Sequence, residues 1–259
     1  MKSRELFETF FYPLVKVNEL YRTTDEHGDL VVYEFNDCRV LTFGSVFEQS
    51  RIRLHQPLQL EHEYTAAMLL PLLLQTPQHV TLLGLGAGVL ASYLFHTFEQ
   101  LPLTVVEWRE TVIDIAHEFF ALPVDARLDI LHDDAGHYMQ STPVHTDWIL
   151  CDLFSASDMS DVQLQADFYR DCFNALHADG WLVLNFHGLP SVECPAMRAL
   201  SAVFPSVFLV SLASGNRVIM ACKTQTQWPL PGHVHTDALP VDLADALLRL
   251  QPRVQSLRA

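Results

Sequence analysis

A chain of 259 residues, of which 49% are hydrophobic and 18% charged, has globular composition and is long enough to bury one large α/β core. The formal charge of −15, from 16 basic and 31 acidic residues, argues against a nucleic-acid partner, because binding phosphates requires clustered basic side chains. The five cysteines are widely spaced and contain no Cys-x-x-Cys pair, which indicates reduced thiols rather than a disulfide framework or a zinc site.

The first part of the chain, residues 1–58, is predicted to form a small β-rich unit. Its opening segment is acidic where a secretory signal needs an apolar core, so we expect a cytoplasmic protein. Residues 30–35 and 39–43 are rich in apolar and β-branched side chains and flank Asn36-Asp37, a turn dipeptide. This pattern predicts a β-hairpin.

Helical spacing replaces the strand pattern from Leu60 to Leu74. Pro71 lies inside this segment and is expected to kink or divide the helix, because proline cannot donate the backbone hydrogen bond. No apolar run in the chain approaches the roughly 20 residues that a membrane span needs, so no membrane partner is expected.

The stretch from His79 to Glu107 carries the most specific pattern in the chain. It predicts a buried strand at 80–83, a glycine turn at 84–88, a helix at 89–96 and a second strand at 103–106 that runs into Glu107. A strand, glycine turn, helix and strand that closes on an acid is the sequence form of a nucleoside-binding crossover. The alternative is an ordinary tight turn between a strand and a helix.

Three features of this stretch together favour a nucleoside without phosphates. Gly84, Gly86 and Gly88 let the backbone and a ligand approach closely. Glu107 lies about 20 residues beyond the turn, where a carboxylate accepts hydrogen bonds from ribose hydroxyls. Gly88 is followed by Val89, so the last glycine of the dinucleotide pattern is missing and a pyrophosphate fits less well.

The alternation of strands and helices continues through residue 221. Further strands are predicted at 128–131, 147–152, 180–185, 207–210 and 217–221, and helices at 111–122, 136–140, 163–176 and 194–204. The last two strands are expected to pair antiparallel around Ser214-Gly215. Residues 59–225 are therefore predicted to form a Rossmann-like domain with a mainly parallel, seven-stranded sheet covered on both faces. Residues 226–259 are expected to form a linker and a short amphipathic helix at 241–248 that packs on the body.

Acidic residues follow several of the predicted strands. In an open parallel sheet ligands bind outside the carboxyl ends of the strands, where Glu107, Asp133, Asp134 and Asp152 fall. Each of these acids alone could equally cap a helix or loop. With the glycine turn they predict one shared nucleoside site. The histidines near Asp133 do not have the spacing of metal ligands, so no metal is expected.

Several short motifs occur in one order along the chain. They are Phe43-Gly44-Ser45 with Gln49-Ser50, Glu61-His62-Glu63-Tyr64, the 84–88 glycine turn, Val106-Glu107, Asp134-Ala135, Asp152, and Phe168-Tyr169 with Cys172 and Gly180. In this order the motifs resemble the class I S-adenosylmethionine-dependent fold and, more narrowly, the spermidine synthase (polyamine aminopropyltransferase) family.

The resemblance implies roles for particular residues. Cofactor binding would fall to residues that match the family motifs, namely Gln49, Gly84, Gly86, Gly88, Glu107, Asp134 and Ala135. Asp152 would be the first acid of the catalytic loop, and Tyr64 would close the pocket beside it. The implied co-substrate is decarboxylated S-adenosylmethionine or S-adenosylmethionine, the partner is a small amine or other small nucleophile, and a homodimer is the expected assembly.

The chain also departs from the family pattern. Ala87 replaces an acid that holds the aminopropyl or amino-acid end of the cofactor, and Ser155 stands where a second acid would bind the diamine. Thr65 follows Tyr64 where the family has His or Gln, and the Tyr-Pro-Ser-Gly segment of the amine pocket has no match at 210–216. The nucleoside half of the site is therefore retained, and the polyamine half is altered.

Three functions remain open from the sequence. They are a spermidine synthase-like transferase of an aminopropyl or other alkyl group, an S-adenosylmethionine-dependent methyltransferase, and an inactive nucleoside-binding homologue. In the first, Asp152 would accept a proton from the attacking nitrogen. An exposed aspartate, with a pKa near ~3.9, is a poor base, so burial would have to raise the pKa of Asp152.

Overall fold

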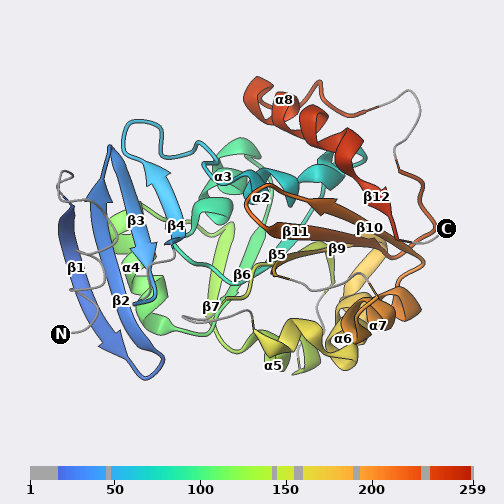
Figure 1. Ribbon diagram of the computed structural model, residues 1–259, viewed down its shortest axis with the longest axis horizontal. Helices are drawn as coiled ribbons and strands as arrows, with labels where there is room; N and C mark the ends of the chain where they lie inside the picture. Colours follow the sequence, from blue (N-terminus) through green and yellow to red (C-terminus); the bar gives the residue numbers. More distant parts are fainter. Residues whose placement is uncertain are drawn as a thin grey trace.

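The computed structural model describes residues 17–44, 48–141, 145–154, 160–188, 193–228 and 234–257. In these residues a four-stranded antiparallel sheet from the N-terminal part lies beside an eight-stranded, mostly parallel sheet (Figure 1). The mixed α/β architecture predicted from the sequence is confirmed. The domain boundaries predicted at residues 58 and 225 stay predictions.

The small sheet has the strand order β1-β2-β3-β4. Its strands are β1 (Asn18–Asp25), β2 (Gly28–Phe35), β3 (Cys38–Thr42) and β4 (Glu48–Arg53). The predicted hairpin is confirmed, because Phe35 pairs with Cys38 across the two-residue turn. Asn36 and Asp37 have φ of 47° and 63°, and positive φ at both turn positions matches the twist of a tight hairpin. The polar sequence of β1 gives no such signal, and the sequence did not predict that strand.

The large sheet has the order β12-β10-β11-β9-β8-β5-β6-β7. Its strands are β5 (Val80–Leu83), β6 (Leu103–Glu107), β7 (Leu128–His132), β8 (Thr146–Cys151), β9 (Leu176–His187), β10 (Ser206–Ser211), β11 (Asn216–Cys222) and β12 (Gln255–Ser256). Neighbours from β7 to β9 pair parallel, whereas β11 pairs antiparallel with both β9 and β10. The seven predicted strands are present. The count of seven was wrong by one, because β12 adds an edge strand of two residues, too short for a sequence pattern.

Helices cover both faces of the large sheet (Figure 1). The helices are α2 (Glu63–Ala67), α3 (Val89–Thr97), α4 (Glu110–Phe120), α5 (Ala135–Ser141), α6 (Ala166–Ala175), α7 (Pro195–Val203) and α8 (Val241–Leu250), with 3-10 turns η1 (Leu70–Leu73), η2 (Asp161–Leu164) and η3 (Gln251–Arg253). One buried cluster joins α2, η1, α3 and α8 to the sheet, and another joins α5, α6 and α7 to its opposite face. The helix predicted at 60–74 is divided as expected, because η1 contains Pro71.

The order in which successive strands are added to the large sheet changes side at β5. β6 and β7 lie on one side of β5, and β8 and β9 lie on the other. Such a switch point leaves a crevice at the carboxyl ends of the strands, which is where ligands bind in open α/β sheets. The small sheet packs close to this crevice, since Leu30, Val32 and Leu41 share a buried cluster with Ala87 and Val112.

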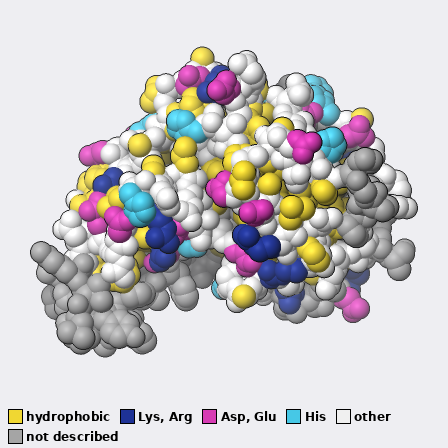
Figure 2. All heavy atoms as spheres, turned by 90° about the horizontal axis from the view of Figure 1, so that it is seen from above, with side chains coloured by type: hydrophobic (Ala, Val, Ile, Leu, Met, Phe, Trp, Pro, Cys, Tyr) yellow, Lys and Arg dark blue, Asp and Glu magenta, His cyan; other side chains and the backbone are white. Residues whose placement is uncertain are grey.

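Surface charge is mixed on the face shown in Figure 2. Lysine and arginine side chains lie there next to aspartate and glutamate side chains. Within the described residues, no helix combines the length and the apolar character that crossing a bilayer would require.

Candidate active site

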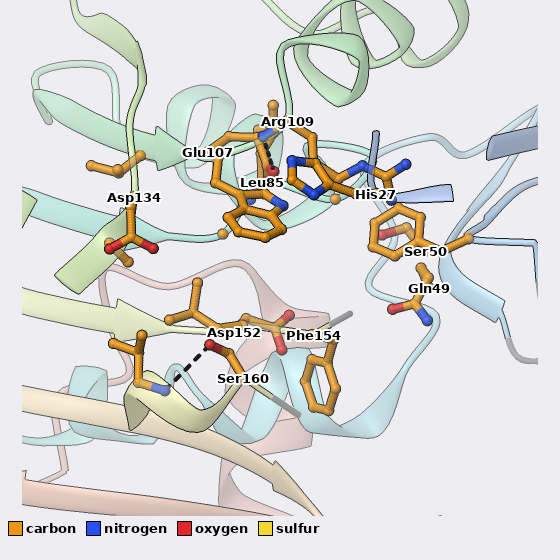
Figure 3. A pocket seen from close by; sticks show the side chains of 18 of the residues that line it. His27, Gln49, Ser50, Leu85, Glu107, Arg109, Asp134, Asp152, Phe154 and Ser160 are labelled. Atoms are coloured by element: carbon orange, nitrogen blue, oxygen red, sulfur yellow. Dashed lines mark hydrogen bonds between the residues drawn. The ribbon is translucent and has the colours of Figure 1, made fainter. Parts of the chain in front are cut away.

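A cavity of about 350 Å³ opens where the carboxyl ends of the central strands meet the small sheet. Side chains from both sheets surround it (Figure 3), and Tyr64 lines it from α2. The lining residues are His27, Phe43, Gln49, Ser50, Tyr64, Gly84, Leu85, Gly86, Val106, Glu107, Trp108, Arg109, Asp133, Asp134, Ala135, Asp152, Leu153, Phe154, Ser160 and Val162. The structure therefore brings most of the predicted site residues to one place.

Gly88 is the exception among the predicted binding residues, because it is not part of the cavity wall. It caps the N-terminus of α3 with φ 73°. A Cβ atom there would lie 2.7 Å from Cδ1 of Leu122, so helix packing and backbone conformation explain this glycine without a ligand.

The other two glycines of the turn lie in the cavity wall against neighbouring chain segments. Gly84 has φ 94°, and a Cβ on it would lie 2.3 Å from the backbone oxygen of Asp152. Gly86 has φ 55°, and its Cβ would lie 2.7 Å from Oγ of Ser50. The turn thus packs against Asp152 at the end of β8 and against Ser50 of β4, and both glycines have positive φ, which other residues rarely adopt.

Glu107 ends β6 and is only 8% exposed. Its Oε2 accepts a hydrogen bond from the backbone N–H of Leu85 at 2.9 Å, and its Oε1 accepts one from the backbone N–H of Arg109 at 3.0 Å. Burial raises the pKa of Glu107, although these backbone donors act in the opposite direction. Because each carboxylate oxygen has two lone pairs, Glu107 retains free acceptor capacity beyond these two hydrogen bonds.

Asp133 and Asp134 lie at the start of α5. Oδ1 of Asp134 accepts from the backbone N–H of His137 at 2.9 Å, so this side chain is fixed in the cavity wall by helix capping. The His137 ring lies 2.9 Å from Oδ1 of Asp133, and the hydrogen bond from that ring lowers the pKa of Asp133. Among the residues described here, no group of three potential ligands is placed to hold a metal ion.

Asp152 follows β8 and is hydrogen bonded from two sides. Nδ2 of Asn185 donates to Oδ1 of Asp152 at 2.8 Å, and the Tyr64 hydroxyl bonds the same carboxylate. Burial raises the pKa of Asp152 to about 6, against the lowering effect of both hydrogen bonds. Burial therefore brings the pKa of Asp152 closer to neutral pH than that of an exposed aspartate.

Sequence reasoning missed a group of residues where the first hairpin of the small sheet meets the end of β6. The His27 ring, in the turn after β1, stacks on Trp108 with ring centroids 3.9 Å apart. Arg109 is 4% exposed and binds both carboxylate oxygens of Asp25. Trp108 and Arg109 directly follow Glu107, so their adjacency to the predicted ribose carboxylate was the available signal. Asp25 and His27 lie at the turn before Gly28, which the sequence marks as a turn residue, but no pattern linked these two side chains to the site.

The structure shows what fills the space around one family departure. Ala87 is 1% exposed and belongs to the apolar cluster between the small sheet and α4, and its backbone N–H donates to Oγ of Ser50 at 3.1 Å. No carboxylate can project from this position. Ser155, the other departure in the catalytic loop, lies outside the described residues, as does Ser45.

The strand order of the large sheet and the cavity at its switch point define a class I methyltransferase-like fold. Solved structures agree. A probable spermidine synthase from Corynebacterium glutamicum superposes with TM-score 0.70 at 22% identity, covering 95% of this chain and 91% of that one. Human methyltransferase-like protein 13 gives TM-score 0.57 at 21% identity over 73% of this chain and 90% of that chain. No protein-family model matches the chain.

Sequence relatives identify the family within this fold. A polyamine aminopropyltransferase of Neisseria meningitidis is 34% identical over 195 residues, covering 73% of this chain and 74% of the relative. One from Chromobacterium violaceum is 29% identical over 207 residues, covering 77% and 79%. This chain belongs to the polyamine aminopropyltransferase, or spermidine synthase-like, family. A Drosophila melanogaster eEF1A lysine and N-terminal methyltransferase homolog matches at 27% identity over 58% of this chain and 24% of its own length. The aminopropyltransferase relatives match more of this chain at higher identity, so methyl transfer is not favoured.

Proposed function

We propose that the protein transfers an aminopropyl group from decarboxylated S-adenosylmethionine to a small amine such as a diamine. The observation that carries this proposal is the position of Asp152. It is a carboxylate with a pKa of about 6, in the same cavity wall as Glu107 and Asp134. Membership of the aminopropyltransferase family supports the reaction type.

In this proposal the nucleoside lies across the carboxyl ends of β5 and β6. Glu107 accepts hydrogen bonds from the ribose hydroxyls, and Asp134 with Ala135 holds the adenine amino group. The Trp108 side chain is 49% exposed although its ring stacks on His27, so it supplies an open apolar surface at the same end of the cavity. Because Glu107 and Asp134 repel phosphates, the cavity suits an uncharged nucleoside moiety.

The charges of the cavity favour the decarboxylated co-substrate. Arg109 is the one arginine or lysine among the described lining residues, and its guanidinium already binds both oxygens of Asp25 and the carbonyl of Gly28. The carboxylate of S-adenosylmethionine would therefore meet acidic side chains with no free guanidinium or ammonium to pair it. The aminopropyl ammonium of the decarboxylated form suits this environment.

The transfer step needs little covalent help from the protein. The nitrogen of the acceptor amine attacks the aminopropyl carbon that is bonded to the sulfonium. The N–C bond forms as the C–S bond breaks, and the electron pair passes to sulfur, which leaves as the thioether of methylthioadenosine. The new ammonium gives its proton to the Asp152 carboxylate, while the Tyr64 hydrogen bond holds that carboxylate in place.

Thermal unfolding with added ligand tests the choice of co-substrate. A ligand that binds only the folded protein stabilises it by about 2.7 kcal/mol when present at 100 times its Kd. We expect decarboxylated S-adenosylmethionine and methylthioadenosine to raise the Tm more than S-adenosylmethionine does, and product to form when putrescine is added. A larger shift with S-adenosylmethionine, together with methylation of an acceptor, would overturn the proposal in favour of methyl transfer.

A further inference from the structure

A chain of hydrogen bonds leads from Asp152 away from the cavity to the turn between β10 and β11. Nδ2 of Asn185 donates to Asp152, and Oδ1 of Asn185 accepts from Nδ2 of Asn216 at 3.1 Å. Oδ1 of Asn216 in turn accepts from the Ser214 hydroxyl at 2.7 Å. Asn185 is 1% exposed. Neither Asn185 nor Asn216 is part of the cavity wall.

We propose that Asn216 is a positioning residue, which holds the Asn185 amide so that its N–H groups face the Asp152 carboxylate. This inference deepens the proposed function and rests on it, because it concerns the group that accepts the proton. It assigns a role in proton acceptance to a strand residue that does not touch the substrate cavity.

The direction of these hydrogen bonds follows from the chemistry of Asp152, the group at which they end. An ionised carboxylate has no proton to donate, so the Asn185 side chain must present its nitrogen to Asp152. The oxygen of Asn185 then faces Asn216, which must present its own nitrogen, and the Ser214 hydroxyl must donate to the remaining oxygen. Every donor along the chain therefore points toward Asp152, and this polarity stabilises the carboxylate anion.

The strand pairing explains why Asn216 can perform this task. Asn185 of β9 pairs in register with Val218 of β11, and Asn216 precedes that residue by two positions. Side chains two residues apart on a strand share a face, so Asn216 is the diagonal neighbour of Asn185 on the face that carries Asp152. Without Asn216, the Asn185 oxygen would lose this donor, and the Asn185 amide would be held less firmly against the Asp152 carboxylate.

Other ionisable groups around Asp152 stay the same when Asn216 is changed. Tyr64 approaches from α2, and Cys151, the preceding residue, directs its thiol to Gln163. Across the cavity lie Glu107, Asp133, Asp134, His27 and Arg109, and His187 pairs in register with Asn216. A change in the pKa of Asp152 on substitution of Asn216 therefore reports the hydrogen-bond chain.

The test is the pKa of Asp152, measured by carbon NMR of labelled aspartate carboxyl groups in the full-length protein. Asn216→Leu keeps the volume but cannot donate, and we expect it to increase the proton affinity of Asp152 by about three- to tenfold. Asn216→Ser, which is too short to reach Asn185, should give a similar shift. Ser214→Ala leaves the Asn216 donor in place and should give a smaller shift in the pKa of Asp152.

Activity gives the second measurement. In Asn216→Leu the acidic limb of the kcat/KM profile should move to higher pH by the same amount, while the KM for the nucleoside co-substrate stays unchanged. An unaltered Asp152 pKa in both Asn216 variants would overturn the inference, as would a lower kcat with an unmoved pH profile. The NMR titration needs no turnover. If the protein were inactive with every amine, the proposed function would be refuted, and the titration would still test whether Asn216 acts on the pKa of Asp152.

Discussion

The guanidinium of Arg109 holds both carboxylate oxygens of Asp25, with Nε–Oδ2 and Nη2–Oδ1 distances of 3.0 and 2.7 Å. The same side chain donates to the carbonyl of Gly28 at 2.9 Å. Arg109 lies two residues after Glu107, so an ion pair between this buried guanidinium and the partly buried Asp25 connects the first hairpin of the small sheet to the carboxylate proposed to bind ribose. Arg109 is also part of the cavity wall.

Breaking this pair should destabilise the protein and weaken nucleoside binding. Asp25→Asn leaves the buried guanidinium without its charge partner, and we expect a loss of about 2–4 kcal/mol in the free energy of unfolding. Urea denaturation measures the effect. Glu19→Gln is the control from the same strand, because the Glu19–Arg22 pair is exposed and should contribute less than about 1 kcal/mol. Equal effects of the two substitutions would contradict this role of Asp25.

Glu107→Gln should affect both stability and binding. Both oxygens of Glu107 accept backbone N–H groups, and an amide can accept at one position only. We expect a loss of about 1–3 kcal/mol in stability and at least a tenfold weaker binding of methylthioadenosine, measured by calorimetry well below the Tm of the variant. Unchanged affinity in a folded variant would remove Glu107 from the site.

Gly84→Ala should be far more damaging than its conformation alone would suggest. Gly84 and Gly28 have similar positive φ, 94° and 109°, but a Cβ at Gly28 meets nothing within 4 Å. Gly28→Ala therefore measures the backbone strain, about 1–3 kcal/mol, without a clash. Gly84→Ala adds a collision with the backbone of Asp152 and should cost several kcal/mol or prevent folding. Similar unfolding free energies for the two variants would show that the turn does not press on β8.

The raised pKa of Asp152 predicts a pH dependence of stability. Because the folded state binds this proton more tightly than the unfolded chain, stability from this group is fully present below pH 3.8 and is lost as the pH rises through about 6. Asp152→Asn should therefore be more stable than the wild type by about 1–3 kcal/mol at pH 7.5, while transfer activity is lost. The difference in stability between Asp152→Asn and the wild type is measured at pH 7.5 and at pH 4. A difference that does not favour the variant more at pH 7.5 than at pH 4 would contradict the raised pKa of Asp152.

Much of the large sheet was predictable from the sequence. The β-branched run at Val80–Leu83, the glycine turn and the placement of Glu107 and Asp152 at strand ends follow from period and spacing. A parallel sheet is buried on both faces, so its strands are continuous apolar runs that stand out in a sequence. The sequence also led to the expectation that burial raises the pKa of Asp152, because an exposed aspartate is a poor base for an amine.

The parts that escaped prediction depend on contacts between distant segments. β1 is polar and partly exposed, so its pairing with β2 is decided by tertiary packing. The His27–Trp108 stack joins residues from different sheets, and the Asn216–Asn185–Asp152 chain joins three strands or strand ends. Gly88 had the spacing of a binding residue, but the structure explains it by helix packing against Leu122.

Product analysis tests the central claim most directly. The purified protein would be incubated with decarboxylated S-adenosylmethionine and putrescine, and methylthioadenosine and spermidine would be measured by mass spectrometry. Aminopropyl transfer predicts equal amounts of the two products, and none above background with Asp152→Asn. Binding of the co-substrate without either product, across putrescine and longer diamines, would contradict the account.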